Sequence, residues 1–492
     1  MTGEILAFVL YFVLMIAVGF IVMAKSKHTG ESEYFLGGRK MGPLVTGLSA
    51  QASDMSGWLL MGLPGSILVA GFGEVWIAIG LAIGSYLAWL LIARRLRVFS
   101  VRSNNAITIP QYLNNRFYAS NKVLQVVCAI VFFVCFTVYV ASGYKAGAAL
   151  FKTVLGVDTF PAMLIFGLII VLYTFSGGFK AVCYTDFFQA LLMLAAMVIA
   201  PIAICIATGN ISFASITESS PNYFNFLPSG KFDLTSIKSI ISGMAWGLGY
   251  FGMPHIIIRY MAIDDAKNIQ KSRIVATVWV VITLAMAAVI GIVGRVTMPE
   301  LVGNGESELV FIKMVRATFP TFISGLLLSA ILAASMSTAD SQLLVGSSAF
   351  TSDIYKSIFR KNASDEELLW IGRLIVLLIA VGAFFIAMAP GAGSIMSLVS
   401  NAWAGFGAAF GPVILLSLYW KRITYPGALA GIICGALTVA VWIAFLSGTG
   451  IYELFPGFIV GLLATVIGSL LSKKPDEKVE ALFDDAIAEL KK

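Results

Sequence analysis

Two hydrophobic segments contain polar and helix-breaking residues where a membrane-spanning helix is ordinarily continuous. The first reads Ala50-Gln51-Ala52-Ser53-Asp54-Met55-Ser56-Gly57-Trp58, and the second reads Trp246-Gly247-Leu248-Gly249-Tyr250-Phe251-Gly252-Met253-Pro254. Such residues are costly at membrane depth unless they line a cavity or bind a ligand. At a break, free carbonyls can bind a cation, and the N–H groups of the next half-helix attract an anion. The pair therefore predicts a site for a small zwitterion and a coupled sodium ion.

Close helix packing is the alternative explanation for the glycines of both segments, because small residues are common where membrane helices touch. Packing explains the glycines alone. It does not explain the polar residues and the proline beside them, which are Ser53, Asp54, Ser56 and Pro254.

A third segment, 333–341, carries oxygen-bearing side chains at helical spacing. Ser337, Asp340 and Ser341 fall at positions i, i+3 and i+4, so they share one helix face, and Thr338 adjoins that face. Bonding of the hydroxyls to carbonyls of their own helix is the alternative. We expect Ser337 and Thr338, together with Asp340, to serve in ion binding. Asp186 is expected to cap a helix, to lie on the ion path, or to do both.

Four aromatic residues lie too deep for the interface belts of a membrane protein: Trp58, Tyr139, Trp246 and Tyr250. We expect them to line a cavity, where their faces can cover a small apolar ring and attract an ammonium group. Arg39 follows Leu36-Gly37-Gly38, and its spacing alone indicates an anchor at the cytoplasmic face.

The composition excludes most other classes of protein. The chain of 492 residues is 59% hydrophobic and 12% charged, with a mean hydropathy of +0.91, which predicts a polytopic membrane protein in a lipid bilayer. Two histidines and five scattered cysteines indicate neither a zinc site nor a disulfide framework. The net charge of +7 is spread among loops, so nucleic acid is not an expected partner. We expect no enzyme activity, no cofactor beyond sodium and no obligatory protein partner.

Thirteen segments are long and apolar enough to span a bilayer. Only seven of the 33 Lys and Arg residues fall on the outer side if the N-terminus lies outside: Lys145, Lys152, Lys231, Lys238, Arg295, Lys313 and Arg316. The others, Arg259 among them, fall in cytoplasmic loops and the tail, which predicts the N-terminus outside and the C-terminus inside. The segments are 4–24, 41–70, 72–96, 123–150, 160–177, 187–207, 236–255, 274–298, 320–346, 367–388, 394–418, 426–447 and 452–472.

The two broken segments are the second and seventh spans. These two spans are five helices apart. Because five is odd, the five-helix blocks 41–207 and 236–418 enter the membrane from opposite sides and form an inverted repeat. This leaves one added helix at 4–24 and two within 426–472, all in a single transmembrane domain, 1–472. The tail, 473–492, is expected to form a short amphipathic cytoplasmic helix.

Long stretches of the chain resemble the sodium/solute symporter family, and within it the bacterial carriers of proline. The resemblance runs over nearly the whole chain and includes 36–39, 50–65, 246–255, 328–338 and 402–412. It implies an all-α LeuT-type fold with a 5+5 inverted repeat. It also implies sodium-coupled import of L-proline by alternating access across a bacterial inner membrane.

The resemblance also implies roles for individual residues. It implies that sodium binds the carbonyls of Ala52, Met55 and Ala334 and the hydroxyls of Ser337 and Thr338. It places the substrate near Ser56, Gly57, Tyr139, Trp246, Tyr250 and Pro254. It implies that Asp54 and Asp186 act in sodium-dependent transport and that Arg39 acts in cytoplasmic gating.

The chain departs from that pattern at two positions. Asp340 stands where the resemblance implies a small or hydroxyl residue, so we hypothesise a second cation site formed by Asp186, Ser337, Asp340 and Ser341, or a protonatable Asp340. Pairing of Asp340 with a polar neighbour in a wet crevice is the alternative. Lys145, close in sequence to Tyr139, bears on the outer vestibule and on substrate preference.

Three other functions remain open at this point. The nearest is a carrier for another small solute, such as a different amino acid, a betaine or a carboxylate. A channel would need rings of ligands around a continuous pore, whereas the sequence offers one asymmetric repeat. An intramembrane enzyme or a sensor lacks support from any metal-binding set, nucleophile–base pair or signalling segment in the sequence.

Overall fold

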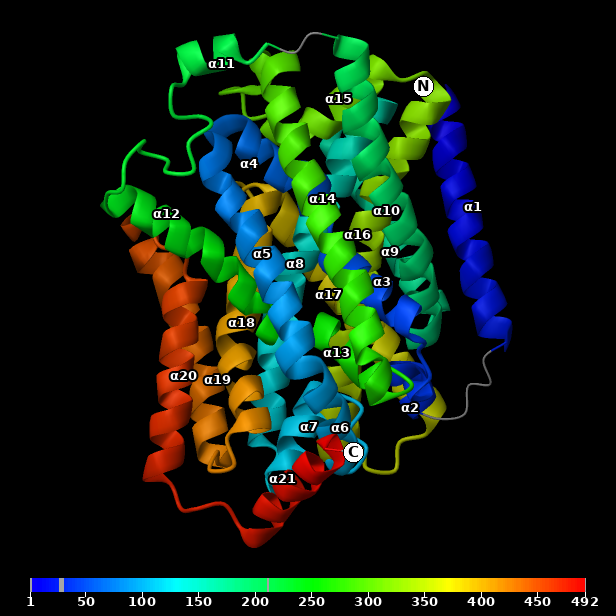
Figure 1. Ribbon diagram of the computed structural model, residues 1–492. Coiled ribbons are helices and arrows are strands. Elements are labelled where there is room, and N and C mark those ends of the chain that lie inside the picture. Colours follow the sequence, from blue (N-terminus) through cyan, green and yellow to red (C-terminus); the bar gives the residue numbers. More distant parts are fainter. Residues whose placement is uncertain (1, 26–30, 210–211, 492) are drawn as a thin grey trace.

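The computed structural model describes residues 2–25, 31–209 and 212–491, and this part of the chain is helical throughout apart from its connecting loops and one isolated bridge, Met41 to Ile263 (Figure 1). Residues 1 and 26–30 of the expected transmembrane domain, and Lys492 of the expected tail, lie outside the described residues.

The α-helices follow one another as α1 (Thr2–Lys25), α2 (Glu31–Leu36), α3 (Pro43–Asp54), α4 (Leu63–Ala70), α5 (Val75–Ala88), α6 (Arg94–Arg102), α7 (Ile109–Arg116), α8 (Val123–Leu155), α9 (Thr159–Ser176), α10 (Phe179–Thr208), α11 (Ala214–Ser219), α12 (Leu234–Ala245), α13 (Pro254–Ala262), α14 (Ile269–Thr297), α15 (Val310–Thr318), α16 (Thr321–Ser348), α17 (Asp365–Met388), α18 (Ile395–Tyr419), α19 (Tyr425–Val441), α20 (Leu454–Leu471) and α21 (Glu477–Leu490). Shorter or differently wound helices connect or extend them: η1 (Gly37–Arg39), η2 (Trp58–Gly62), η3 (Gly71–Glu74), η4 (Trp89–Ala93), η5 (Trp246–Phe251), η6 (Ala266–Asn268), η7 (Pro299–Leu301), η8 (Ser307–Leu309), η9 (Ala349–Phe359), η10 (Trp442–Leu446) and η11 (Ser447–Thr449).

Ten helical segments of the described chain are long and apolar enough to cross a membrane. Three of the thirteen expected spans do not appear as separate segments of this length. The segment 41–70 is interrupted after Asp54 and then runs without a long loop into the next span. The segment 236–255 is divided between α12, η5 and α13, and α9 is shorter than the others. Helix-breaking residues thus account for two of the three differences.

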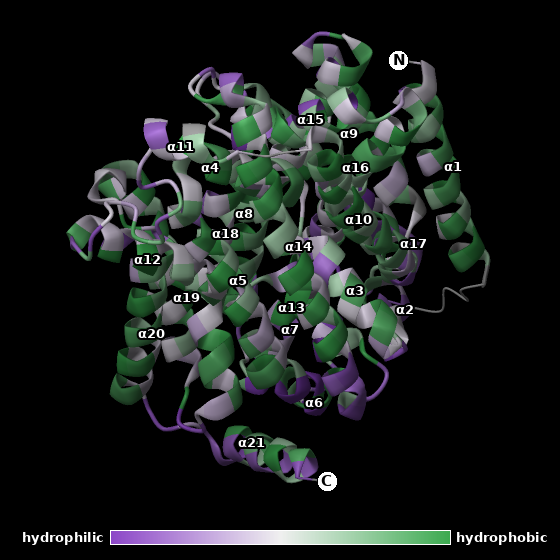
Figure 2. Ribbon diagram, turned by 45° about the horizontal axis from the view of Figure 1, so that its top comes forward, coloured by the Kyte–Doolittle hydropathy of each residue, from purple (hydrophilic) through white to green (hydrophobic). Residues whose placement is uncertain are grey.

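Two long helices form the centre of the bundle. In the apolar stretches of α16 and α18, 83% of residues are buried, compared with 22% in α1 and in α19. α1 packs against α10 and α16 at one edge, while α19 and α20 pack against each other and α18 at another (Figure 1). Hydrophilic residues gather at the ends of the long helices, around α6 and α21 (Figure 2).

The two broken segments are held deep in this bundle by close backbone contacts. A Cβ on Gly247 would come within 2.3 Å of the Gly80 carbonyl oxygen, so η5 can approach α5 only where both helices carry glycine. A Cβ on Gly57 would lie 2.5 Å from the Ala146 Cβ atom. Close packing therefore does explain glycines in both segments, as the alternative reading of the sequence held.

Capping residues set the ends of the broken segments. Pro254 begins α13, where its missing N–H group is not needed. Asp233 precedes α12 and accepts a hydrogen bond from the Ser236 backbone N–H at 2.9 Å, which lowers the pKa of the Asp233 carboxyl. Both half-helices thus start at residues suited to that position.

The tail folds into α21, which packs across α6 at the end of the bundle where both helices lie (Figure 1). Its buried face is formed by Val479, Leu482 and Ala486. The Phe483 ring meets that of Phe99 with centroids 5.5 Å apart. The tail is therefore part of the folded body of the protein.

Candidate functional site

The two broken segments meet in space. α3 ends at Asp54 and the chain resumes helical winding at Trp58, while η5 lies between α12 and α13 in the other segment. The Trp58 and Trp246 ring centroids are 6.4 Å apart. The Tyr250 hydroxyl donates a hydrogen bond to the Asp54 carboxylate. A direct hydrogen bond between side chains thus joins two breaks through residues that are 196 positions apart in the sequence.

The first break presents polar atoms that lack partners. The Asp54 carbonyl accepts hydrogen bonds from the Tyr139 hydroxyl at 3.1 Å and from the Trp58 indole at 3.3 Å. In contrast, Asp54 Oδ1 and Ser56 Oγ are buried and have no hydrogen-bond partner among the described residues. Buried polar atoms are rarely left unpaired in proteins, and each exception needs an explanation. A bound polar ligand would supply the missing partners.

Aromatic side chains separate this region from a cavity of about 370 Å³. Trp246 lines the cavity and stacks on Tyr452 with ring centroids 5.0 Å apart. Behind it, the Trp403 indole donates to the Trp246 carbonyl at 2.8 Å. Trp246 is therefore held from two sides at the boundary between the cavity and the breaks.

These contacts bring three of the six expected substrate residues, Tyr139, Trp246 and Tyr250, to the first break, where Ser56 and Gly57 lie between Asp54 and Trp58 in the chain. Pro254 is buried at the start of α13, four residues beyond Tyr250. Trp403 and Tyr452 were missed by the sequence analysis. The signal for Trp403 was its place in the stretch 402–412, whereas Tyr452 follows a loop and resembles an interface residue.

The expected sodium ligands converge from α3 and α16. The Ser337 hydroxyl donates to the Ala52 carbonyl at 2.7 Å, and Thr338 donates to the same carbonyl at 3.3 Å. Ser337 also lies 3.2 Å from the Ala334 carbonyl of its own helix, so its shorter bond crosses between helices. Met55 is the C-cap residue that follows α3. Carbonyl and hydroxyl oxygens in one place are the ligands that hard cations take, and this donor set fits sodium.

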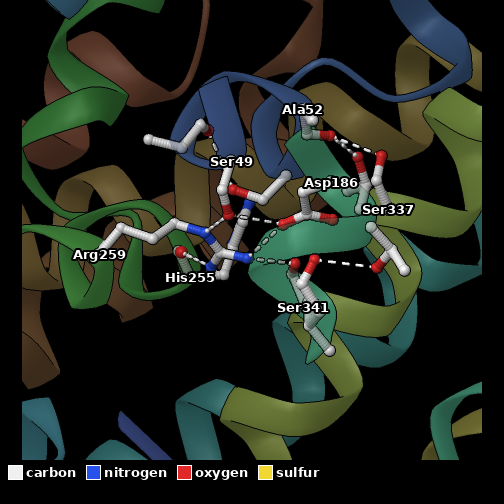
Figure 3. A network of polar contacts seen from close by, with 12 residues as sticks. Ser49, Ala52, Asp186, His255, Arg259, Ser337 and Ser341 are labelled. Carbon is white, nitrogen blue, oxygen red and sulfur yellow. Dashed lines mark hydrogen bonds and ion pairs between the residues drawn. The ribbon is translucent and has the colours of Figure 1, made fainter. Parts of the chain in front are cut away.

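Asp186 lies inside α10, which begins at Phe179 after Gly178, so the expectation that it caps a helix is wrong. It forms an ion pair that the sequence analysis did not foresee. Arg259 donates to Asp186 Oδ2 at 2.9 Å, and the two side chains are 1% and 0% exposed (Figure 3). The expectation that Arg259 lies in a cytoplasmic loop is therefore wrong, because the last turn of α13 carries it into the bundle. A lone arginine near a helix end has the same appearance in a sequence whether it anchors the helix or is buried.

Arg259 gathers polar groups from three other helices (Figure 3). It donates to Ser49 at 2.9 Å and to Ser341 at 2.5 Å, and also to the His255 carbonyl. Ser49 in turn donates to Asp186 Oδ2 at 2.7 Å. The arginine thus supplies positive charge beside two residues of the hypothesised second cation site.

Asp340 stands apart from this network. It is 2% exposed, and its Oδ1 atom makes no hydrogen bond within the described ranges. It lines a largely apolar cavity, together with residues of α1, α9 and α10. The four residues of the hypothesised second site are therefore divided between the arginine network, the sodium ligands and this cavity.

Arg39 closes one end of the molecule. Its guanidinium donates to Ser100 at 3.0 Å and to the carbonyls of Met261 and Ala106 at 2.7 Å each. These bonds tie the start of the first broken segment to α13 and to the loop after α6. Lys145, at another place in the bundle, donates to the Gly393 carbonyl.

Comparisons with known proteins agree with this arrangement. The family model described as the sodium:solute symporter family matches residues 34–435. The sodium/proline symporter of Escherichia coli (strain K12) is 45% identical over 99% of this chain and 97% of its own length. The osmoregulated proline transporter OpuE of Bacillus subtilis (strain 168) is 44% identical over 96% of each chain.

Solved structures support the fold. A sodium-coupled sialic acid symporter in a substrate-bound outward-open state superposes with a TM-score of 0.79 at 20% identity, covering 96% of this chain and 99% of that one. MhsT in complex with L-phenylalanine gives a TM-score of 0.54 at 15% identity over 87% and 98%. Both neighbours are LeuT-like, which supports the expected all-helical fold class. The family model matches most of this chain, and relatives of 44–45% identity align along nearly all of it. This chain therefore belongs to the sodium:solute symporter family.

Proposed function

We propose that this protein imports L-proline together with sodium by alternating access. The observation that supports it most directly is 45% identity, along nearly the whole chain, to curated sodium/proline symporters. The unpartnered atoms at the first break add to it, because a zwitterion would satisfy them. The protein is a multi-pass membrane protein, and its bacterial relatives favour the cytoplasmic membrane as its location.

Each part of proline has a matching feature in the site. The carboxylate would meet the Ser56 hydroxyl and the N-terminal ends of the half-helices at the breaks, since half-helix N-termini attract anions. The secondary ammonium has two N–H donors, which suit carbonyl oxygens and the unpartnered Asp54 Oδ1. The apolar ring would lie against the faces of Trp246 and Tyr250, and Tyr139 and Gly57 would bound the space. Pro254 would fix the angle of α13 beneath it.

Sodium coupling would act through α3. The proposed ligands are the carbonyls of Ala52, Met55 and Ala334 with the hydroxyls of Ser337 and Thr338. Ala52 precedes Asp54 by two residues, so a cation that fixes the end of α3 also fixes the substrate groups that follow. A cation that binds one conformation better shifts the population toward it. At −100 mV the membrane field contributes about 2.3 kcal/mol for each charge moved inward.

The conformation of the protein is consistent with entry from one side. A cavity leads to Trp246, while the opposite end is tied by the bonds of Arg39. We assign the cavity to the outer side and Arg39 to the cytoplasmic gate. Opening toward the cytoplasm would then require Arg39 to release Met261 and Ala106.

The topology we propose is thirteen spans with the N-terminus outside and the C-terminus inside. Repeat one covers 41–207 and repeat two covers 236–418, with added helices at 4–24 and within 426–472 in one domain. The basic residues support this orientation, and moving Arg259 out of the loop count leaves their asymmetry intact.

For the second cation we keep the proposal that Asp186, Asp340 and Ser341 contribute with Ser337. Arg259 limits this second site, because the guanidinium already neutralises Asp186 and donates a hydrogen bond to the Ser341 hydroxyl. Asp340 is therefore the residue on which a second sodium would most depend.

The test is radiolabelled L-proline uptake into proteoliposomes, with and without an inward sodium gradient. Saturable uptake that collapses without sodium is the expected result. Sodium-driven uptake of another amino acid, a betaine or a carboxylate, without any of proline, would overturn the substrate and keep the coupling.

A further inference from the structure

A second cavity lies away from the residues proposed for proline. It has a volume of about 380 Å³ and is formed between α1, α9, α10 and α16. Its walls are mainly apolar and include Met15, Gly19 and Met336. Phe20, also in the wall, is 54% exposed on the outside of the bundle, so the cavity opens on the lipid-facing side. The volume lies within the range of roughly 300–1,000 Å³ that is typical of small-molecule pockets.

Two polar atoms in this cavity have no partner. Asp340 Oδ1 and the Tyr173 hydroxyl are buried, line the cavity and make no hydrogen bond within the described chain. Thr174 and Thr185 interact with Asp340 and Tyr173, respectively, but each threonine hydroxyl donates its proton to a carbonyl of its own helix, Ile170 or Val182, at 2.9 Å. A carboxylate without a donor in an apolar cavity is energetically unfavourable.

The chemistry of the walls decides what can pair with this carboxylate. Apart from Asp340 and Tyr173 the cavity walls are mainly apolar, so they supply few further oxygen ligands for a small cation. Arg259 is engaged by Asp186, Ser49 and Ser341. A cationic group that carries its own apolar body satisfies both the carboxylate and the walls. The opening toward lipid admits such a molecule from the bilayer.

We propose that this cavity binds a lipophilic primary ammonium. Its NH₃⁺ group donates to Asp340 and Tyr173, and its alkyl chain lies along Met15, Gly19 and Met336 toward the membrane. Each buried methylene contributes about 0.8 kcal/mol, so a chain of moderate length adds affinity to the ion pair. This site goes beyond the proposed import of proline and does not depend on which solute is carried, but its ammonium would compete with the proposed second sodium for Asp340.

Direct binding of radiolabelled n-decylammonium to the purified protein in lipid nanodiscs tests the proposal. Empty nanodiscs of the same lipid give the partitioning background. Saturable binding of one molecule per protein above that background is expected. Unlabelled n-decylammonium should displace it at concentrations at least about tenfold lower than n-decanol or n-decanoate, because only the amine pairs with Asp340.

Two variants distinguish the cavity from the membrane. A Cβ on Gly19 meets nothing within 4 Å, so Gly19→Leu fits the helix and adds a side chain to the cavity wall where the alkyl chain is proposed to lie. It should abolish saturable binding while sodium-driven uptake continues as in the unmodified protein. Asp340→Asn should remove the preference for the amine over decanol. Saturable binding that survives Gly19→Leu, or a preference for the amine that survives Asp340→Asn, would overturn the proposal. Absence of proline uptake alongside saturable amine binding would refute the transport function alone.

Discussion

Replacing Asp186 by asparagine is expected to destabilise the protein by about 3–5 kcal/mol, because it leaves a buried charge without its partner. Arg259 is 1% exposed, and its remaining partners, Ser49, Ser341 and the His255 carbonyl, are all neutral. Since about 1.4 kcal/mol corresponds to a tenfold change in an equilibrium constant, the folding equilibrium should fall by at least about two orders of magnitude.

A double-mutant cycle separates the ion pair from the packing around it. Arg259→Gln should destabilise for the converse reason, since it leaves the Asp186 carboxylate buried. The double variant Asp186→Asn/Arg259→Gln has no unpaired charge, so its loss should be well below the sum of the two single losses. The free energy of unfolding can be measured in mixed micelles by titration with sodium dodecyl sulfate, without sodium gradient or proline.

An exposed ion pair of the same chain provides the control. Lys421 and Asp484 are 2.7 Å apart but 39% and 61% exposed, so Asp484→Asn should cost about 0–1 kcal/mol. The reasoning is refuted if Asp186→Asn costs no more than Asp484→Asn. It is also refuted if the double variant equals the sum of the single variants within about 0.5 kcal/mol.

Three further predictions concern transport. Ser337→Ala removes a hydroxyl that bonds Ala52 across two helices, and it should raise the sodium concentration for half-maximal proline uptake by about tenfold, which equals about 1.4 kcal/mol. The control Ser329→Ala removes a buried hydroxyl that bonds only its own helix, and equal shifts in both variants would contradict the assignment. Trp403→Phe leaves a buried carbonyl of η5 without its donor and should raise the KM for proline in uptake assays, with little change expected in sodium dependence. Asp340→Ser should lower the Hill coefficient for sodium, and an unchanged coefficient would count against a second cation.

The sequence was sufficient for the fold class and for the positions of the breaks. Apolar length is a local property, and the described helices fall on the expected segments, including both halves of the broken ones. Glycine, proline and polar residues act on the backbone within a few positions, so the interruption after Asp54 and the one before Pro254 were predictable. The positions of Ser337, Asp340 and Ser341 along α16 also followed from the sequence, whereas their use as ion ligands stays a prediction.

Partners across helices were not predictable in this way. The sequence places Arg259 one turn from a helix end, where an exposed anchor and a buried ion pair look alike, and only the packing of α13 against α3 and α16 decides between them. The same holds for Tyr452, whose ring reaches Trp246 only because α20 lies beside η5.

Asp340 shows most clearly the difference between what the sequence predicts and what helix packing decides. Its spacing predicted that it would share a site with Ser337 and Ser341, but the turn of the helix places neighbours against different surroundings. Ser341 meets Arg259, while Asp340 lines a cavity shared with α1. The sequence by itself determined which residues carry polar atoms into the membrane and where the helices break, because these are local properties of the chain. Which of those atoms find partners, and which face a cavity, was decided by tertiary structure, because it depends on helices that are distant in sequence.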